Sequence, residues 1–327
     1  MGCTQTKVTD TADSGQLKQT KEKPTKQSKN KNGKTTDVEI LEPVKPKATY
    51  ANYLSSYDGK VKNESACSLR GVTFMQNGDL VVADYKNNKL KLYSSKFEFL
   101  AELELPSAPW DVCQAADNAD DILATVPYKK EVHRITVSIE NNKERLVPLS
   151  EFRTEGFCWG ISCFDGGIAT CVKVSVPEKA WPKPPEFQVH IHEFDGTYRR
   201  AIMFDANSVP YFKEPKYLNV TYDDLFLLIS DYKQNTVMCM NNEDELIFSY
   251  LGMKSPNGIA MDENKNLHIA SFFGAQRVHK VGPNGKYIDG LPHDEDRPLF
   301  PHGICYRRKD KIIVMTTDQS LEVYKLV

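Results

Sequence analysis

Hydrophobic residues recur in short runs from about residue 50 onward, and turn residues separate these runs. Between residues 68 and 105 the runs are GVTF, DLVVAD, KLKLY and EFLAELEL, which are rich in β-branched, aromatic and aliphatic residues. The pair Asn77-Gly78 between the first two runs is a strong hairpin signal. The pattern predicts four short antiparallel strands joined by tight turns.

The same pattern repeats along the chain. The phrase DYKNNKL at 84–90 returns 147 residues later as DYKQNTV at 231–237, again after an apolar run. A second phrase, close to P-x-G-I, opens six units, and its second residues are 40, 49, 57, 41 and 45 residues apart. The six phrases are LRGV (69–72), PWDV (109–112), CWGI (158–161), PKYL (215–218), PNGI (256–259) and PHGI (301–304). Because propeller blades have four strands and repeat at about 40–50 residues, an all-β, six-bladed β-propeller is predicted.

Three details of the units agree with this architecture. The long third unit contains the insertion VSVPEKAWPKPPEFQ (174–188), whose prolines cannot join a central ladder. FDGT (194–197) and PNGK (283–286) place hairpin turns where third and fourth strands should meet. The third position of the phrase is Gly in four of the six units, which predicts close approach between neighbouring inner strands.

The ends of the repeat region predict how the ring closes. The sixth unit supplies only three strands before Val327, whereas ATYANYLSSY (48–57) precedes the first unit with no other partner. An N-terminal strand that completes the last blade would remove a free sheet edge. We therefore expect the propeller to occupy residues 48–327.

Residues 1–47 have a different composition. They are poor in large apolar residues and carry ten Lys against six Asp or Glu, whereas the whole chain has a net charge of −2. Such a segment cannot bury enough surface to offset its ordering entropy, so it is predicted to be a disordered, lysine-rich tail. The lysines that cluster between residues 18 and 34 are Lys18, Lys21, Lys23, Lys26, Lys29, Lys31 and Lys34.

The tail begins MGCTQT, which matches the M-G-x-x-x-[ST] signal for N-myristoylation, with Gly2 as the acceptor. One myristoyl chain binds membranes only reversibly, so a second signal is needed for stable anchoring. Cys3 is placed for palmitoylation, and the hexapeptide resembles the starts of Src-type kinases and G-protein α subunits. The clustered lysines would add attraction to an anionic cytoplasmic leaflet. We expect lipid anchoring at the cytoplasmic face of a membrane; the alternative is a chance M-G start before a charged linker in a cytoplasmic protein.

SLRGVTFMQNGDLVVADYKNNKLKLY and PKYLNVTYDDLFLLISDYKQNTVMCM resemble the NHL repeat of tripartite-motif and related proteins. The resemblance covers about residues 65–327 and implies a six-bladed propeller that acts by binding. It implies no ubiquitin-ligase activity, because nothing in the chain resembles a RING, B-box or coiled coil. Some NHL propellers bind RNA, so an RNA-binding propeller is a second possibility. The acidic body opposes it, since nucleic-acid affinity depends on phosphate neutralisation.

SPNGIAMDENKNLHIASFFGAQRVHKVGPNGK (255–286) also resembles a blade of the regucalcin/gluconolactonase group, and PHGI is similar to the paraoxonases. That resemblance implies a calcium-dependent lactonase or esterase with an axial metal held by Glu, Asn and Asp. Here Asn257 alone occupies a comparable position, and Asp111 is one possible further ligand. Two oxygens do not satisfy Ca²⁺, which takes six to eight, so we expect no metal, no cofactor and no enzymatic activity.

The second residues of the six phrases should line one mouth of the central channel. They combine two cations, two indoles, an amide and an imidazole: Arg70, Trp110, Trp159, Lys216, Asn257 and His302. This set would suit a protein, an anionic peptide or a small ligand with a carboxylate or phosphate. The alternative is that these residues cap the channel and bond to water or backbone.

Other candidate chemistry is weak. His190 and His192 share one strand face, but no third ligand is identifiable, so a solvated face is expected. No G-x-S-x-G, G-x-G-x-x-G or P-loop motif occurs. The eight cysteines form no C-x-x-C pair and are expected to be reduced and buried. The sequence therefore predicts a lipid-anchored propeller that serves as an interaction scaffold or ligand-binding module.

Overall fold

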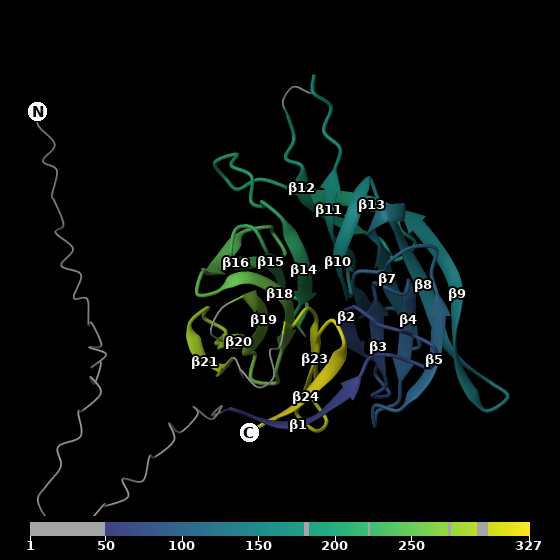
Figure 1. The fold of residues 1–327 in the computed structure, drawn as a ribbon. Helices are drawn as coiled ribbons and strands as arrows, with labels where there is room; N and C mark the ends of the chain where they lie inside the picture. Colours follow the sequence, from purple (N-terminus) through teal and green to yellow (C-terminus); the bar gives the residue numbers. More distant parts are fainter. Residues whose placement is uncertain (1–49, 180–182, 222, 274–275, 293–299) are drawn as a thin grey trace, which may run out of the picture. The chain divides into compact units, whose positions relative to one another are not determined.

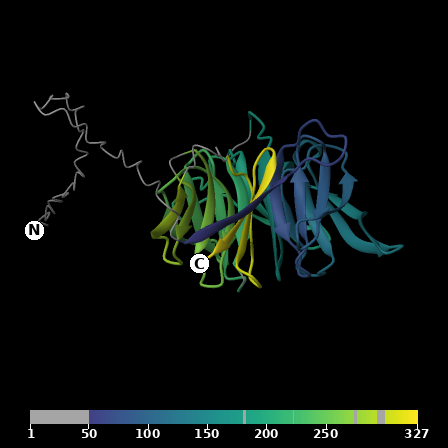
Figure 2. The ribbon, with the colours of Figure 1, turned by 60° about the horizontal axis from the view of Figure 1, so that its bottom comes forward.

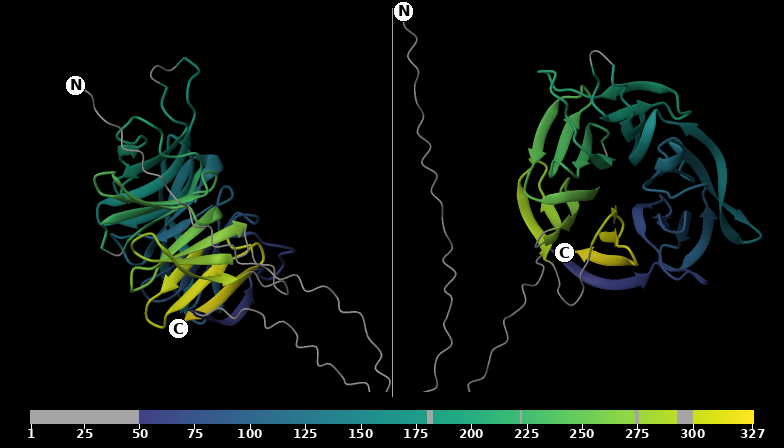
Figure 3. Two further views of the ribbon diagram at one scale, coloured as in Figure 1. Left: turned by 90° about the vertical axis from the view of Figure 1, so that its left-hand side faces the viewer. Right: turned by 45° about the horizontal axis from the view of Figure 1, so that its top comes forward.

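Six four-stranded antiparallel sheets follow one another round a ring (Figures 1 and 2). The computed structural model describes residues 50–179, 183–221, 223–273, 276–292 and 300–327. The right-hand view of Figure 3 looks roughly down the central axis of the ring, about which the six sheets are arranged. The predicted six-bladed β-propeller is confirmed.

The first three blades each use consecutive strands. Blade 1 comprises β2 (Leu69–Phe74), β3 (Leu80–Asp84), β4 (Lys89–Tyr93) and β5 (Phe99–Glu104). Blade 2 comprises β6 (Val112–Gln114), β7 (Asp121–Val126), β8 (Glu131–Glu140) and β9 (Lys143–Arg153), with a short 3₁₀ helix, η1 (Pro127–Lys129), between β7 and β8. Blade 3 comprises β10 (Gly156–Phe164), β11 (Gly167–Val174), β12 (Phe187–His192) and β13 (Tyr198–Ile202).

Blades 4 and 5 follow the same order, and blade 6 does not. Blade 4 comprises β14 (Pro215–Val220), β15 (Phe226–Asp231), β16 (Thr236–Asn241) and β17 (Leu246–Tyr250). Blade 5 comprises β18 (Lys254–Met261), β19 (Leu267–Phe273), β20 (Gln276–Val281) and β21 (Tyr287–Pro292). Blade 6 comprises β22 (Ile304–Arg307), β23 (Ile312–Thr316), β24 (Ser320–Leu326) and, as its outer strand, β1 (Ala51–Asp58).

The N-terminal strand closes the ring as predicted. β1 pairs antiparallel with β24, from Ala51 opposite Leu326 to Asp58 opposite Ser320, with one irregularity between Tyr53 and Ser55. This pairing joins the two ends of the propeller by main-chain hydrogen bonds. The last blade therefore has four strands.

Closure also uses a buried ion cluster, which we call the closure clamp: Lys91, Asp84, Glu64 and the carbonyl of Gly59. The side chain of Lys91 is 0% exposed, and its Nζ lies 2.6 Å from Asp84 Oδ2 and 2.6 Å from Glu64 Oε2. The same ammonium donates to the Gly59 carbonyl over 2.8 Å. Gly59 and Glu64 belong to the segment that runs from β1 to β2, so the clamp fastens the closing segment to blade 1.

Apolar residues fill the space between neighbouring blades. One buried cluster lies between each pair of blades, and residues from both sheets contribute to it. The second strands of the blades are therefore covered on both faces; β3, for example, is buried at every position. Strands with two covered faces read as continuous apolar runs, which explains sequences such as LVVAD and FLLIS.

The glycines of the P-x-G-I phrase allow neighbouring inner strands to approach closely. A Cβ on Gly71 would lie 2.5 Å from the Cα of Asp111, and one on Gly160 would lie 2.7 Å from the Cα of Tyr217. Gly258 and Gly303 likewise face backbone atoms of the next blade. Any side chain at these four positions would separate adjacent blades, as the sequence predicted.

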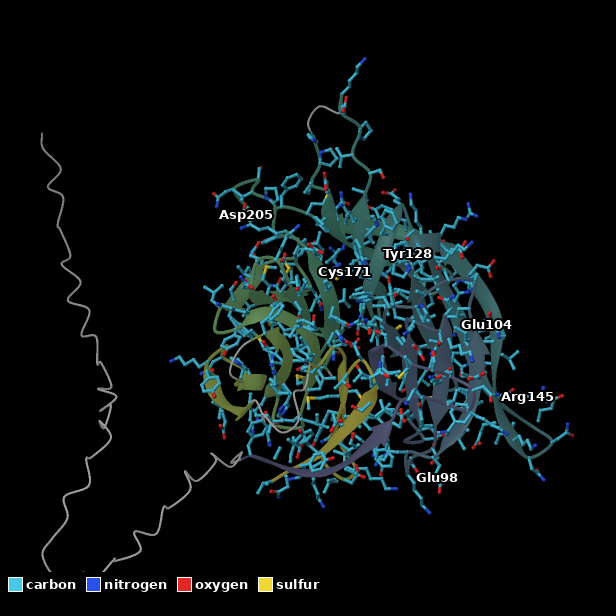
Figure 4. All side chains as sticks on the ribbon, viewed as in Figure 1. Glu98, Glu104, Tyr128, Arg145, Cys171 and Asp205 are labelled. Atoms are coloured by element: carbon cyan, nitrogen blue, oxygen red, sulfur yellow. The ribbon has the colours of Figure 1, made fainter. Side chains whose placement is uncertain are left out.

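The predicted turns and the insertion also appear. FDGT connects β12 to β13 and PNGK connects β20 to β21, with positive φ at Gly196 and Gly285. Of the predicted insertion 174–188, residues 175–179 and 183–186 lie between β11 and β12 and residues 180–182 are not described, whereas Val174 ends β11 and Phe187 and Gln188 begin β12. One feature was not predicted: the long β8–β9 hairpin, whose far end carries Arg145 (Figure 4). No helix in the described ranges is long and apolar enough to cross a membrane.

Candidate functional site

Five of the six predicted mouth residues line one cavity at the end of the channel. The cavity has a volume of about 330 Å³ and is lined by Arg70, Trp110, Lys216, Asn257 and His302, together with Glu214, Tyr232, Phe272 and Asp318. Trp159 is not part of this lining, but its ring lies beneath Lys216, with the Nζ 4.1 Å from the ring centroid. The repeat register thus brings residues from all six blades to one place.

Hydrogen bonds between blades hold the backbone of the mouth residues. Thr125 on β7 donates to the Trp159 carbonyl over 2.5 Å, and Ser230 on β15 donates to the Asn257 carbonyl over 2.5 Å. Thr316 on β23 donates in the same way to the Arg70 carbonyl. Each donor lies on the second strand of one blade and each acceptor on the inner strand of the next. The mouth is therefore positioned by the core of the ring rather than by mobile loops.

Lys216 is held between two indoles and a carboxylate. Its Nζ lies 5.2 Å from the Trp110 ring centroid and 3.0 Å from Glu214 Oε1. Burial raises the pKa of Glu214, but the ammonium groups of Lys216 and Lys233 outweigh burial and hold it below its usual value. This cation therefore reaches the mouth already neutralised.

Arg70 has a second set of partners. Its Nη2 lies 3.5 Å from Asp318 Oδ1, and its guanidinium carbon lies 5.5 Å from the Trp110 ring centroid. Nη1 of Arg70 contacts the His302 imidazole, 2.6 Å from Nδ1. Like Lys216, Arg70 shares its charge with a carboxylate. The mouth carries two matched ion pairs rather than the two bare cations that the sequence suggested.

His302 and Asp318 form a hydrogen-bonded pair at the rim. Nε2 of His302 lies 3.3 Å from Asp318 Oδ1. Burial, and then the charge of Arg70, lowers the pKa of His302, so the imidazole is neutral at pH 7. Nη1 of Arg70 contacts both ring nitrogens of His302, so Nε2 faces Arg70 as well as Asp318. The His302 imidazole, then the Ser68 hydroxyl and Arg70, hold the pKa of Asp318 well below its usual range.

Three buried polar groups in this region have no hydrogen-bond partner among the residues that the structure describes. They are Nε of Arg70, Nε1 of Trp110 and the hydroxyl of Tyr217. The Tyr217 and Trp110 ring centroids are 6.0 Å apart and Arg70 lies over Trp110, but Arg70 and Trp110 line the mouth whereas Tyr217 lines the channel below it. Burial raises the pKa of Tyr217, which keeps its hydroxyl protonated. A buried donor without an acceptor costs about 1–3 kcal/mol.

Asn257 is held by its amide. Its Nδ2 donates to the Pro301 carbonyl over 2.9 Å, which leaves its side-chain oxygen as the atom available to a ligand. The structure adds Glu214 and Asp318 to the oxygen groups at the mouth, but both carboxylates are paired with cations. Within the described part of the chain, no group of three or more His, Cys, Asp or Glu side chains is placed to hold a metal ion.

The channel below the mouth is a separate compartment. It has a volume of about 240 Å³ and is lined by inner-strand residues of all six blades, including Asp111, Cys113, Ser162 and Cys163. Backbone groups occupy both oxygens of the Asp111 carboxylate. It accepts the N–H of Val112 over 3.0 Å and that of Ile161 over 3.1 Å. Burial raises the pKa of Asp111 to about 7. Its role in the structure is to join blades 2 and 3.

The expectation for the histidine pair was wrong. His190 and His192 are buried, not solvated, and both lie against Tyr198. Nε2 of His190 lies 2.8 Å from Gln188 Oε1, and burial lowers the pKa of His190 to about 4. Tyr198 of the neighbouring strand β13 contacts both rings, and Phe152 of blade 2 packs on His192, which the alternation within QVHIHEF alone does not reveal.

Sequence reasoning missed four residues of the mouth: Glu214, Tyr232, Phe272 and Asp318. None occupies a position of the P-x-G-I phrase; they lie at strand ends and in connecting loops. Two of the four do have a sequence signal. Glu214 lies two residues before Lys216, and Tyr232 follows Asp231 in the repeated DYK phrase. The candidate lipidation sites Gly2 and Cys3 and the seven clustered lysines lie outside the described residues.

Comparisons with known proteins agree with the fold. No protein-family model matches the chain, and no curated protein matches its sequence. A solved streptogramin B lyase is similar in structure, with a TM-score of 0.57 and 14% identity over 84% of this chain and 98% of that one. A catalytically inactive virginiamycin B lyase from Staphylococcus aureus, solved with quinupristin, has a TM-score of 0.56 and 12% identity over 84% and 99%.

A functionally unknown protein from Desulfotomaculum acetoxidans is similar at a TM-score of 0.52 and 13% identity, over 74% of each chain. At such identities the likeness shows a shared fold alone, because one fold hosts many functions. Membership of the NHL group remains a prediction from the sequence.

Proposed function

We propose that this propeller binds a ligand with an anionic acceptor group, a carboxylate or a phosphate, at the channel mouth. The observation that carries the proposal is the pair of unpartnered donors at the mouth, Nε of Arg70 and Nε1 of Trp110. Both groups only donate hydrogen bonds, so the missing partner is a hydrogen-bond acceptor. An anion in the cavity would offer an acceptor to both.

The ion pairs refine the chemistry of this ligand. Because Asp318 and Glu214 neutralise Arg70 and Lys216, a strong positive field does not draw the ligand in. Affinity depends instead on short-range hydrogen bonds and on contact with the indole of Trp110. A small acid or the acidic side chain of a partner peptide fits this description better than a nucleic acid, whose affinity depends on many phosphate contacts.

Binding can be tested by titrating intrinsic tryptophan fluorescence with N-acetylglutamate and, separately, with inorganic phosphate. Trp110 lies in the cavity, so saturable quenching is expected with at least one of the two probes. Arg70→Gln should weaken that binding at least tenfold, whereas Lys286→Gln, a matched change on the outer β20–β21 turn, should not alter it. No saturable change with either probe would contradict the proposal.

We also propose that the binding module is anchored at the cytoplasmic face of a membrane through residues 1–47. Gly2 and Cys3 would carry the two acyl chains that stable anchoring requires, and the lysine cluster would add attraction to anionic lipids. Gly2→Ala should move the protein from the membrane fraction of its native cell to the supernatant. A wild-type protein with an unmodified amino terminus would contradict the anchor.

A second candidate function is catalysis at the same mouth. The neutral imidazole of His302 would act as a general base once a ligand draws Arg70 away from its ring nitrogens, with Asp318, 3.3 Å from Nε2, orienting the ring. The structural likeness to a streptogramin B lyase raises lyase action on a streptogramin as the reaction class. Incubation with quinupristin, followed by mass spectrometry, tests this: a product lost in His302→Ala would support catalysis, and unchanged substrate would support binding alone.

A further inference from the structure

The outermost strand of each blade is a sheet edge, and protein edges usually carry charges or proline that discourage pairing with another chain. Five of the six outer strands have such protection. The protecting residues include Asp58 in β1, Glu102 and Glu104 in β5, Pro148 in β9, Arg199 and Arg200 in β13, and Asp289 in β21. β17, with the sequence LIFSY, contains neither charge nor proline. Among the outer strands that the structure describes, β17 is the one without protection.

β17 borders an open groove with a volume of about 850 Å³. The opposite wall is the loop between β13 and β14, in which Phe204 and Pro210 form a β-bridge. The carboxylate of Asp205 accepts the backbone N–H groups of Asn207 and Val209 over 2.9 and 2.8 Å, so this wall is preformed. Figure 4 shows Asp205 on this loop, which stands out from the ring.

The floor and walls of the groove expose aliphatic side chains. Val209 is 55% exposed, Leu246 44% and Ile247 50%, and all three line the groove. Ile247 lies at an irregularity in the pairing of β16 with β17, between the pairs Cys239–Phe248 and Met240–Leu246. What sets this edge apart is its apolar composition, because β5, β13 and β21 carry similar irregularities.

The rim of the groove is acidic. Four lining residues are carboxylates, Asp205, Glu243, Asp244 and Glu245, and no lining residue is Lys or Arg. Arg200 pairs with Asp244 from the adjoining surface. The other three have no basic partner among the ion pairs of the described residues. An incoming chain that carries positive charge would therefore gain rather than lose electrostatic energy on docking.

We propose that this groove docks an extended segment of a partner protein in which lysine or arginine alternates with aliphatic residues. Side chains alternate between the two faces of a strand, so such a segment would place aliphatic groups on Leu246 and Ile247 and cations toward the acidic rim. Its backbone would add a strand to the free edge of β17.

The charge distribution favours this occupant over two others. A second copy of the chain, paired edge to edge, would bring two acidic rims together, which is unfavourable. An anionic lipid surface would be repelled for the same reason. The site lies on the outside of blade 4 and does not depend on ligand binding at the channel mouth.

The proposal is tested with the full-length chain and a fluorescein-labelled octapeptide of alternating lysine and valine. Fluorescence anisotropy should rise saturably, and the affinity should fall as salt rises from 50 to 500 mM because exposed charges are screened. An octapeptide of alternating glutamate and valine should not bind. Equal binding of the two peptides, or of neither, would overturn the proposal.

Matched variants separate this edge from the rest of the surface. Ile247→Lys adds a charge to β17 and should weaken the lysine–valine peptide at least tenfold. Leu251→Lys, a 71% exposed apolar residue just after β17 that does not line the groove, should change affinity less than twofold. Circular dichroism of both variants verifies that they fold. A dimer in sedimentation that Ile247→Lys abolishes would overturn the proposal by assigning the edge to a second copy.

Discussion

The closure clamp and the channel mouth are both built from charged side chains, yet they differ in how completely those side chains are satisfied. In the clamp, the three hydrogens of the Lys91 ammonium meet Asp84, Glu64 and the Gly59 carbonyl. At the mouth, the cations are also paired, but two buried donors, Nε of Arg70 and Nε1 of Trp110, have no acceptor among the described residues. A saturated cluster stabilises a fold, whereas an unsaturated one at the end of a channel marks a place where a ligand can bind.

The repeat itself sharpens this contrast. Blade 4 carries the same DYK phrase as blade 1, but the position of Lys91 is taken by Met238. Asp231 of blade 4 accepts the backbone N–H groups of Lys213 and Glu214 and has no buried ammonium beside it among the described contacts. Blade 4 receives no closing segment, so the lysine occurs where the chain crosses from the last blade to the first.

The largest predicted effect comes from breaking the clamp. Lys91→Met, which copies the blade 4 residue, should lower the free energy of unfolding by about 3–5 kcal/mol because it leaves the buried Asp84 carboxylate without a cation and Glu64 with Lys89 alone. Lys89→Met, which removes a more exposed partner of Glu64, should cost less than about 1 kcal/mol. Urea unfolding followed by far-ultraviolet circular dichroism measures both. Equal losses for the two variants would show that the clamp has no special role in closure.

Acid should destabilise the propeller through its buried histidines before it affects either charged cluster. Burial lowers the pKa of His190 to about 4, so below about pH 6.5 the unfolded chain binds a proton that the folded chain does not. Stability should therefore fall as pH drops from 6.5, by about 1.4 kcal/mol per pH unit for this group. His190→Phe should reduce that slope between pH 6.5 and 5 in urea titrations. An unchanged slope would assign the acid sensitivity to other groups.

The carboxylates of both clusters should respond only at lower pH. The pKa of Asp84 lies below its ordinary value, because Lys91 and Asn87 together outweigh burial, and the pKa of Asp318 is also lowered. A group with a depressed folded pKa contributes stability above its unfolded pKa and loses it as pH falls through the folded value. Their contribution should therefore persist down to about pH 4.

At the mouth, the predicted effects concern affinity more than stability. Trp110→Phe keeps an aromatic ring beside Arg70 but removes the unpartnered Nε1–H, so the affinity for the bound acid should fall about three- to tenfold, the value of one hydrogen bond. Trp159→Phe is the matched control, because Trp159 does not line the cavity, and it should change affinity less than twofold. Fluorescence from the remaining tryptophans, or calorimetry, reports both. A larger loss of affinity in Trp159→Phe than in Trp110→Phe would show that the ligand does not bind at Trp110.

The smallest predicted effect goes in the opposite direction. Asp318→Asn removes the carboxylate that neutralises Arg70, so an anionic ligand should bind about two- to fivefold more tightly. The Asp318 side chain is 53% exposed, so screening by water and salt limits the gain. In calorimetric titrations, the affinity difference between Asp318→Asn and wild type should be smaller at 300 mM salt than at 50 mM. Weaker binding in Asp318→Asn would mean that this carboxylate itself contacts the ligand.

Much of the fold was predictable because a propeller repeats. Six inner-strand phrases at blade-like spacings fixed the number of blades, and the missing fourth strand of the last blade predicted the pairing of β1 with β24. The same register placed Arg70, Trp110, Lys216, Asn257 and His302 at one mouth, since residues at matching repeat positions lie at matching heights around the axis.

The rest depends on contacts that no repeat position encodes. Glu214 and Asp318 neutralise the mouth from strand ends and loops, and Glu64 reaches Lys91 from the segment between β1 and β2. The burial of His190 follows from tertiary packing, including its contact with Tyr198 of β13, which the alternation along its own strand does not specify. Pairing between distant loop residues is set by tertiary geometry, so sequence patterns of period 2 or of blade length cannot find it.

The difference between the two clusters is tested most directly by one titration of tryptophan fluorescence with N-acetylglutamate and inorganic phosphate, performed on wild-type, Lys91→Met and Arg70→Gln proteins at equal folded fraction. Wild-type and Lys91→Met should saturate with the same dissociation constant for the probe that binds, and Arg70→Gln should need at least tenfold more of it. Identical responses from all three proteins, or none from the wild type, would contradict the assignment of the channel mouth as the binding site.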